Sequence, residues 1–166
     1  MEALRRIVPD LRVRIIAYRD RGDRFVTLSS PLTFDGRLLE DFLGCLPAAG
    51  GGDMPEAVHE GLRSAILKTP WRNKSHRLVL LFGDAPPHQE DLEQIQQLVE
   101  GFEGAVHTVS VSGGRAGPIA EPFRKIASWG GGSFLALAGA DDIVRSILVL
   151  TLGPKHRAAI ESLFGL

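Results

Sequence analysis

The sequence predicts an α/β protein with a doubly wound, mostly parallel sheet that has one antiparallel edge strand and helices on both faces. Short apolar runs of strand length alternate along the chain with segments in which apolar residues recur at helical spacing. The connections between these segments are short, and such alternation is typical of parallel sheets with right-handed crossovers. A tight turn between the first two strands makes them antiparallel neighbours. The 166 residues are enough for one domain with a sizeable core.

The expected strands differ in how they are covered. The run RLVLLF from Arg77 to Phe82 is continuously apolar, as in a central parallel strand that is buried on both faces. The run LRVRIIAY first alternates and then becomes apolar, which predicts a strand that enters the sheet from an edge. The full set of expected strands is Leu11 to Tyr18, Phe25 to Ser29, Arg77 to Phe82, Val106 to Val111 and Ser133 to Leu137.

The expected helices lie between these strands. Asp35 is a good N-cap for the first amphipathic helix, and Pro9 ends the last turns of an earlier helix at Glu2 to Val8. The other expected helices are Asp35 to Leu46, Pro55 to Lys68, Gln89 to Phe102, Pro122 to Trp129 and Asp141 to Leu150. Residues 1–153 are therefore assigned to one domain, and residues 154–166 to a C-terminal helix or tail.

Composition argues against several classes of function. The formal net charge of −1 provides no positive field for nucleic acid, and no apolar run reaches the roughly 20 residues of a membrane span. The only cysteine, Cys45, excludes an internal disulfide and a cysteine-rich zinc site, and we expect it to be a small apolar core residue. Cys45 and the absence of an export signal slightly favour an intracellular location.

Acidic side chains follow two of the predicted elements at the edge of the sheet where ligands bind in α/β proteins. Asp84 ends the most apolar strand, and Asp53 and Glu56 stand in a glycine-rich loop before a helix. Asp53 also suits a helix N-cap. Carboxylates that converge at one rim are the hard oxygen ligands that Mg²⁺, Mn²⁺ or Ca²⁺ takes, so these three residues are the candidate metal ligands.

Three segments together carry a family resemblance. The strings AYRDRGD, GGGDMPEAVHEGL and LVLLFGDAPPH resemble von Willebrand factor A-type domains, particularly those associated with atypical alpha-kinases. The resemblance implies a metal-ion-dependent adhesion site in which a partner protein's acidic side chain completes the metal shell. It assigns Asp84 to the acid that ends the family's fourth strand, Glu56 to the glutamate of a DxPE loop, and Asp53 to an accessory position.

The sequence departs from the family pattern at two places. Met54 lies close to a position where many members have a threonine ligand, and a thioether does not bind a hard cation. The family's DxSxS motif is absent, because its first, central strand would precede Met1. We therefore expect a domain that lacks this strand and binds a divalent cation weakly.

These observations favour a protein-binding module without catalytic activity, since no nucleophile, base pair or cofactor loop is apparent. One alternative is a Mg²⁺-dependent phosphohydrolase or phosphotransferase of another α/β fold, for which Asp20 is the candidate nucleophile. Another is a scaffold domain that has lost its metal site. No nucleic-acid partner and no membrane insertion are expected.

Overall fold

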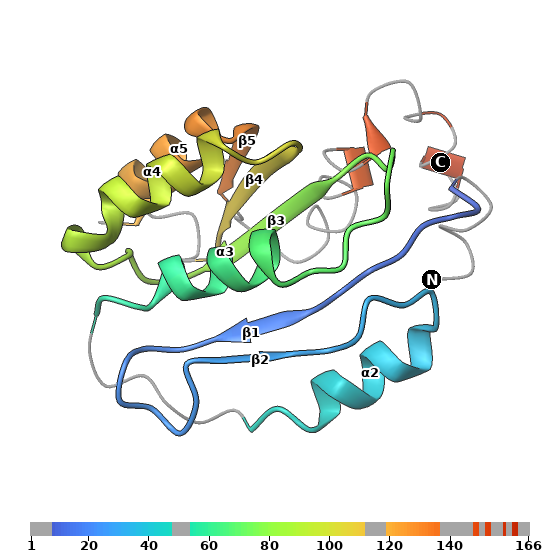
Figure 1. Ribbon diagram of the computed structural model, residues 1–166, viewed down its shortest axis with the longest axis horizontal. Helices are drawn as coiled ribbons and strands as arrows, with labels where there is room; N and C mark the ends of the chain where they lie inside the picture. Colours follow the sequence, from blue (N-terminus) through green and yellow to red (C-terminus); the bar gives the residue numbers. More distant parts are fainter. Residues whose placement is uncertain are drawn as a thin grey trace.

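The computed structural model describes residues 8–47, 54–111 and 119–136, together with residues 148, 149, 152, 153, 158, 161 and 162. It confirms a mixed α/β protein. The described elements form two groups, a three-stranded parallel sheet with its helices and a two-stranded antiparallel sheet with one helix (Figure 1). In the part of the chain that is described, no helix is both long and apolar enough to cross a bilayer.

The larger sheet has the strand order β3-β4-β5, and all three strands are parallel. Strand β3 spans Leu78–Gly83, β4 spans Ala105–Ser110 and β5 spans Gly131–Ala136. Leu78 lies opposite Ala105 and Gly83 opposite Ser110, so β3 and β4 end at the same edge of the sheet. This edge leads directly into the loop that begins with Asp84.

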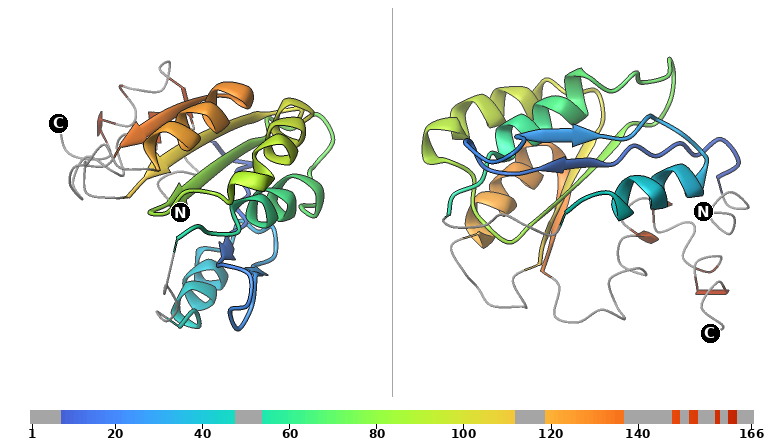
Figure 2. Two further views of the ribbon diagram at one scale, coloured as in Figure 1. Left: turned by 90° about the vertical axis from the view of Figure 1, so that its left-hand side faces the viewer. Right: turned by 90° about the horizontal axis from the view of Figure 1, so that it is seen from below.

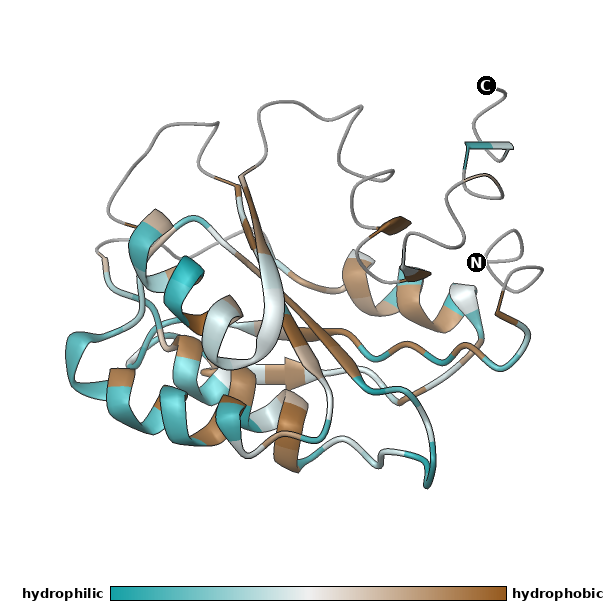
Figure 3. Ribbon diagram, turned by 90° about the horizontal axis from the view of Figure 1, so that it is seen from above, coloured by the Kyte–Doolittle hydropathy of each residue, from teal (hydrophilic) through white to brown (hydrophobic). Residues whose placement is uncertain are grey.

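Helices α3 (Val58–Leu67), α4 (Leu92–Glu100) and α5 (Ala120–Trp129) pack on one another and on this sheet (Figure 2). A short 3₁₀ helix, η1 (Gln89–Asp91), leads into α4. The apolar side of each helix faces a shared core, as the hydropathy colouring illustrates (Figure 3). The core residues are Val58, Leu62, Ile66, Val79, Leu81, Ile95, Val99, Phe102, Val106, Ile119, Phe123 and Ile126.

The smaller group consists of β1 (Ile16–Tyr18), β2 (Thr27–Ser29) and α2 (Gly36–Gly44). Strand β1 pairs with β2 in antiparallel register, as the tight turn predicts. Asp35 caps α2 as expected, because its carboxylate accepts a hydrogen bond of 2.9 Å from the Arg37 N–H. Strands β1 and β2 are shorter than the sequence indicates, whereas β3 and β4 have the expected length.

Other expectations are only partly met. Helices α3, α4 and α5 share one face of the parallel sheet, and the described residues do not establish the doubly wound arrangement. The expected helix at Asp141 to Leu150 lies outside the described residues except for its last turn, and the one at Glu2 to Val8 except for Val8. The core position expected for Cys45 is wrong. Cys45 is exposed because it follows α2, which has Leu39 as its only buried residue.

Candidate functional site

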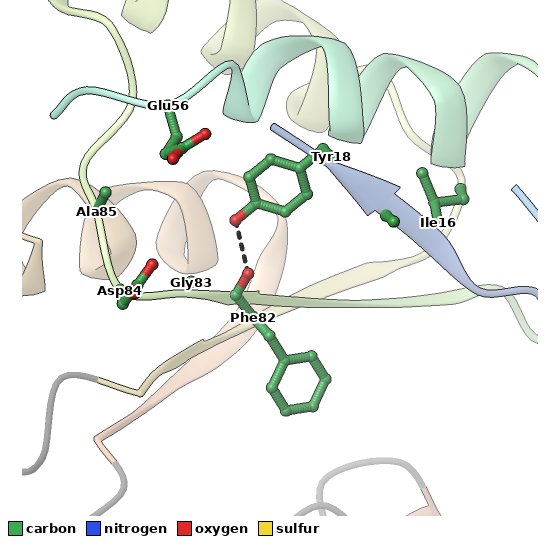
Figure 4. Close-up of a pocket in the computed structure, with 8 residues that line it drawn as sticks. Ile16, Tyr18, Glu56, Phe82, Gly83, Asp84 and Ala85 are labelled. Atoms are coloured by element: carbon green, nitrogen blue, oxygen red, sulfur yellow. Dashed lines mark hydrogen bonds between the residues drawn. The ribbon is translucent and has the colours of Figure 1, made fainter. Parts of the chain in front are cut away.

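A pocket of about 250 Å³ lies between β1 and the carboxyl end of β3 (Figure 4). Its walls are formed mainly by apolar side chains and backbone atoms, and two carboxylates lie at one end. The lining residues are Ile16, Ala17, Tyr18, Glu56, Phe82, Gly83, Asp84 and Ala85. The structure thus brings Glu56 and Asp84 to one pocket, as the sequence predicts, whereas Asp53 lies outside the described residues.

The backbone fixes Glu56 beside the loop that follows β3. Its N–H donates a hydrogen bond of 3.0 Å to the carbonyl of Pro86, and Glu56 and Pro87 form an isolated parallel bridge. The side-chain atom Oε2 is buried and has no hydrogen-bond partner among the described residues. Burial raises the pKa of Glu56, and the charges of Asp20, Asp23 and Asp84 raise it further, against the opposite effect of His88.

Asp84 occupies the other side of the same end of the pocket. It is exposed to solvent directly after the last residue of β3. Among the described residues, no three His, Cys, Asp or Glu side chains are placed to hold a metal ion together. The carboxylates of Glu56 and Asp84 are the kind of oxygen donor that Mg²⁺ prefers. Two carboxylates alone do not complete the octahedral shell of this ion.

Three side-chain contacts fasten the turn after β1 to the segment from His88 to Asp91, and one of them is the ion pair of Arg21 with Glu90 at 3.2 Å. His88 Nε2 donates to Asp20 Oδ1 at 2.5 Å, and this hydrogen bond is the main cause that lowers the pKa of Asp20. The Arg21 guanidinium donates at 2.6 Å to the carboxylate of Asp91, which is buried. The sequence analysis named Asp20 only as a candidate nucleophile and missed the contacts of Asp20 with His88 and of Arg21 with Asp91, because the partners are 68 and 70 residues apart.

Tyr18 also lines the pocket, and the sequence analysis did not name it as a site residue. Its hydroxyl donates a hydrogen bond of 2.6 Å to the Phe82 carbonyl, so the ring connects β1 to β3. A Cβ atom on Gly61 would lie 3.0 Å from the ring, and one on Gly83 would lie 2.7 Å from the hydroxyl oxygen. Burial raises the pKa of Tyr18 well above its ordinary value, and Glu56 and Asp84 add to this shift.

Asp20, the nucleophile that a phosphohydrolase would need, already accepts the His88 hydrogen bond. Its lowered pKa stabilises the ionised form. The pocket instead combines a buried, unpaired carboxylate oxygen with a second carboxylate and with exposed strand backbone.

No protein-family model matches the chain. The chain is 35% identical over 78 residues to an ariadne-like RING finger protein of Acanthamoeba polyphaga mimivirus, a match that covers 47% of this chain and 8% of that protein. RING fingers bind zinc through several cysteines, and Cys45 is the only cysteine here, so the match does not extend a RING finger to this chain.

One solved structure is also similar, an uncharacterized membrane-spanning protein from Vibrio fischeri. The identity is 20%, the match covers 90% of this chain and 83% of that one, and the TM-score is 0.37.

Proposed function

We propose that this chain is a non-catalytic protein-binding module that resembles von Willebrand factor A-type domains in a doubly wound fold. Its binding surface is the rim around the pocket, where Glu56 and Asp84 meet. The observation that supports this role most directly is the buried Glu56 Oε2, which has no hydrogen-bond partner in the described part of the chain. A buried carboxylate oxygen of this kind is costly unless a cation or a proton compensates it.

The proposal includes a divalent cation, Mg²⁺ or the related Mn²⁺ or Ca²⁺, at this rim. Glu56 and Asp84 would supply two oxygens, and Asp53 is the third residue that we assign to the site. A bound cation would polarise an acidic side chain from the partner protein and join it to the rim. Because Met54 offers no hard donor, we expect the affinity for the cation to be low.

Calorimetric titration with Mg²⁺ and Mn²⁺ tests the cation. We expect heat of binding from the unaltered protein and its loss in Glu56→Gln and Asp84→Asn, which keep the size of each side chain but remove its charge. Glu60→Gln is the matched control, because Glu60 lies in the first turn of α3 but not in the pocket. If Asp84→Asn leaves the affinity unchanged, the metal site is wrong and a scaffold without metal replaces it.

A further inference from the structure

We propose that this chain associates with further copies of itself head to tail, so that a basic end of one copy binds an acidic end of the next. The basic end comprises residues 10–14 and 68–76, and the acidic end comprises residues 20–24, 54–56 and 84–91. This association goes beyond the protein-binding role proposed above, because it uses a second surface and needs no divalent cation.

The basic and acidic ends lie on opposite sides of β1 and β3. Residues 68–76 lead into β3 and residues 84–91 follow it, so the length of this strand, about 3.3 Å for each residue, separates them. Strand β1 separates residues 10–14 from the turn at 20–24 in the same way. Figure 1 shows the turn between β1 and β2 on the left and the segment between α3 and β3 on the right. One copy therefore cannot bring its own two ends together.

The basic end carries five cationic side chains and one carboxylate, that of Asp10. Two arginines join its two segments. Arg14 donates at 2.6 Å to the Lys68 carbonyl, and Arg72 donates at 2.5 Å to the Asp10 carbonyl. These acceptors are neutral, and none of the five cations forms an ion pair with a described carboxylate, so the positive charge is not compensated. The five are Arg12, Arg14, Lys68, Arg72 and Lys74.

The acidic end carries six carboxylates and two arginines, a net of four negative charges against four positive charges at the basic end. Asp20, Asp23 and Asp84 all raise the pKa of Glu56, so these acids form one group. Of the two arginines, Arg21 pairs with carboxylates of its own end. The six acids are Asp20, Asp23, Glu56, Asp84, Glu90 and Asp91. The two ends are thus matched in the sign and size of their charge.

An exposed apolar side chain stands beside each group of charges. Leu67, directly before Lys68, has 64% of its surface exposed, and Met54, two residues before Glu56, has 59% exposed. Contact between the two ends would remove apolar surface from water at the same time as it pairs the charges. The formal net charge of the chain is −1, so the repulsion between whole copies is small.

A contact of this kind is heterologous, because one copy contributes its basic end and the next contributes its acidic end. Each added copy brings one further basic end and one further acidic end. The association therefore continues into chains and does not stop at a dimer. Because the attraction is between exposed charges, salt weakens it.

Sedimentation equilibrium in buffer that contains a chelator tests the association, at protein concentrations up to about 1 mM. In about 10 mM salt, where the Debye length is about 30 Å, we expect the weight-average mass to rise with concentration from the 18.0 kDa monomer past the dimer. In about 1 M salt, where the Debye length is about 3 Å, the protein should be monomeric. Monomers at low salt, association that salt does not weaken, or a plateau at the dimer would each overturn the proposal.

Neutralising each end in turn distinguishes a head-to-tail contact from other modes of association. Lys68→Gln with Lys74→Gln weakens the basic end, and Asp23→Asn with Asp84→Asn weakens the acidic end. Each double variant alone should associate about fivefold more weakly, because two exposed charge pairs are lost. A mixture of the two should form 1:1 pairs at the unaltered strength, since one intact basic end meets one intact acidic end, and these pairs should not grow. Unaltered association of either variant alone, or no pairing in the mixture, would overturn the proposal.

The matched control is Glu40→Gln with Asp41→Asn, two exposed acids of α2 that lie outside both ends. It removes as much charge as the acidic-end variant and should leave the association unchanged. Equal weakening in the control would mean that net charge alone decides, and would contradict a defined contact. The single changes Lys74→Gln and Asp84→Asn repeat the comparison with half of the charge removed, should a double variant not fold.

The self-association and the metal site can fail separately. Without a divalent cation the acidic end keeps its full charge, so absence of Mg²⁺ binding would leave the low-salt association intact and would overturn only the metal site. Monomers at low salt in the chelator would overturn only the self-association. If both hold, added Mg²⁺ should weaken the association of the unaltered protein, because the bound ion neutralises part of the acidic end.

Discussion

The two groups of elements are stabilised in different ways. The group from α3 to β5 surrounds a continuous apolar core that includes the fully buried Leu62, Ile95 and Phe123. In the group formed by β1, β2 and α2, the described residues that are buried are Ser30 and Leu39. Because burial of apolar surface is the main favourable term in folding, the first group has its own source of stability and the second depends on its attachment to the first.

That attachment combines the packing of the Tyr18 ring on the core with several hydrogen bonds. Arg14 donates at 2.6 Å to the Lys68 carbonyl at the end of α3, and Arg21 and Tyr18 bind the Asp91 carboxylate and the Phe82 carbonyl. Such hydrogen bonds give direction and register, but each contributes only about 1 kcal/mol in net terms, or somewhat more when one partner is charged. The comparison therefore predicts a stable core and a strand pair that opens locally at low cost.

The largest effect is expected from a core substitution. Phe123→Ala removes a fully buried ring that packs beside Gly83, and we expect it to lower the free energy of unfolding by about 3–5 kcal/mol. Chemical denaturation measures this loss. Leu39→Ala, in α2, is the matched control and should cost about 2 kcal/mol, the low end for such a change, with amide protection of β4 unaltered. If both variants lost amide protection in β4 to the same extent, the two groups would not have separate sources of stability.

An intermediate effect is expected at the contact between the groups. Tyr18→Phe removes one hydrogen bond without changing the packing on Gly61, so the free energy of opening β1 should fall by about 1 kcal/mol. Amide exchange at Ala17, which faces β2, reports this change. Exchange in β4 should stay the same, and a matching loss there would show that the two groups unfold together.

A smaller, pH-dependent effect is expected at Glu56. Its pKa in the folded protein is raised, so the protonated form favours folding. That contribution is complete below the unfolded pKa of about 4.3 and is lost as the pH rises through the folded value. Glu56→Gln should therefore be more stable than the unaltered protein near pH 7 and equal to it near pH 4. Thermal unfolding at both pH values, without divalent cations, measures the difference, and a larger gain at pH 4 would contradict it.

The smallest effect is expected on the exposed side of α2. Leu43 has 51% of its surface exposed, so Leu43→Gln should change the free energy of unfolding by no more than about 0.5 kcal/mol. Urea denaturation of this variant beside Leu39→Ala separates the two sides of the helix. A loss near 2 kcal/mol would mean that another surface covers Leu43.

The sequence predicted best those features that depend on local pattern. The apolar run before Asp84 forms β3, and Asp35 caps α2. The spacing of apolar residues in the helix expected from Pro55 to Lys68 predicts a buried side, of which Ala57, Val58, Leu62 and Ile66 are buried and Ala65 is half-buried. Glu56, which precedes α3, and Asp84, which follows β3, line one pocket, as the sequence predicts. Their role as metal ligands stays a prediction.

Features that depend on long-range contact were not predicted. The pairs of Asp20 with His88 and of Arg21 with Asp91 join two loops whose separate sequences contain no sign of one another. Cys45 was misplaced because the frequent burial of free cysteine is a tendency of the residue type and does not show whether anything covers this position.

Tyr18 is the only tyrosine of the chain, and this gives the protein a built-in spectroscopic probe. A fluorinated tyrosine incorporated during expression would produce a single fluorine resonance, from the ring that lies between Gly61 and Gly83. Because its hydroxyl is bound to the Phe82 carbonyl and its surroundings include Glu56 and Asp84, the resonance would respond to a cation, a partner protein or the opening of β1. One label at one position could thus follow all three events in the same sample.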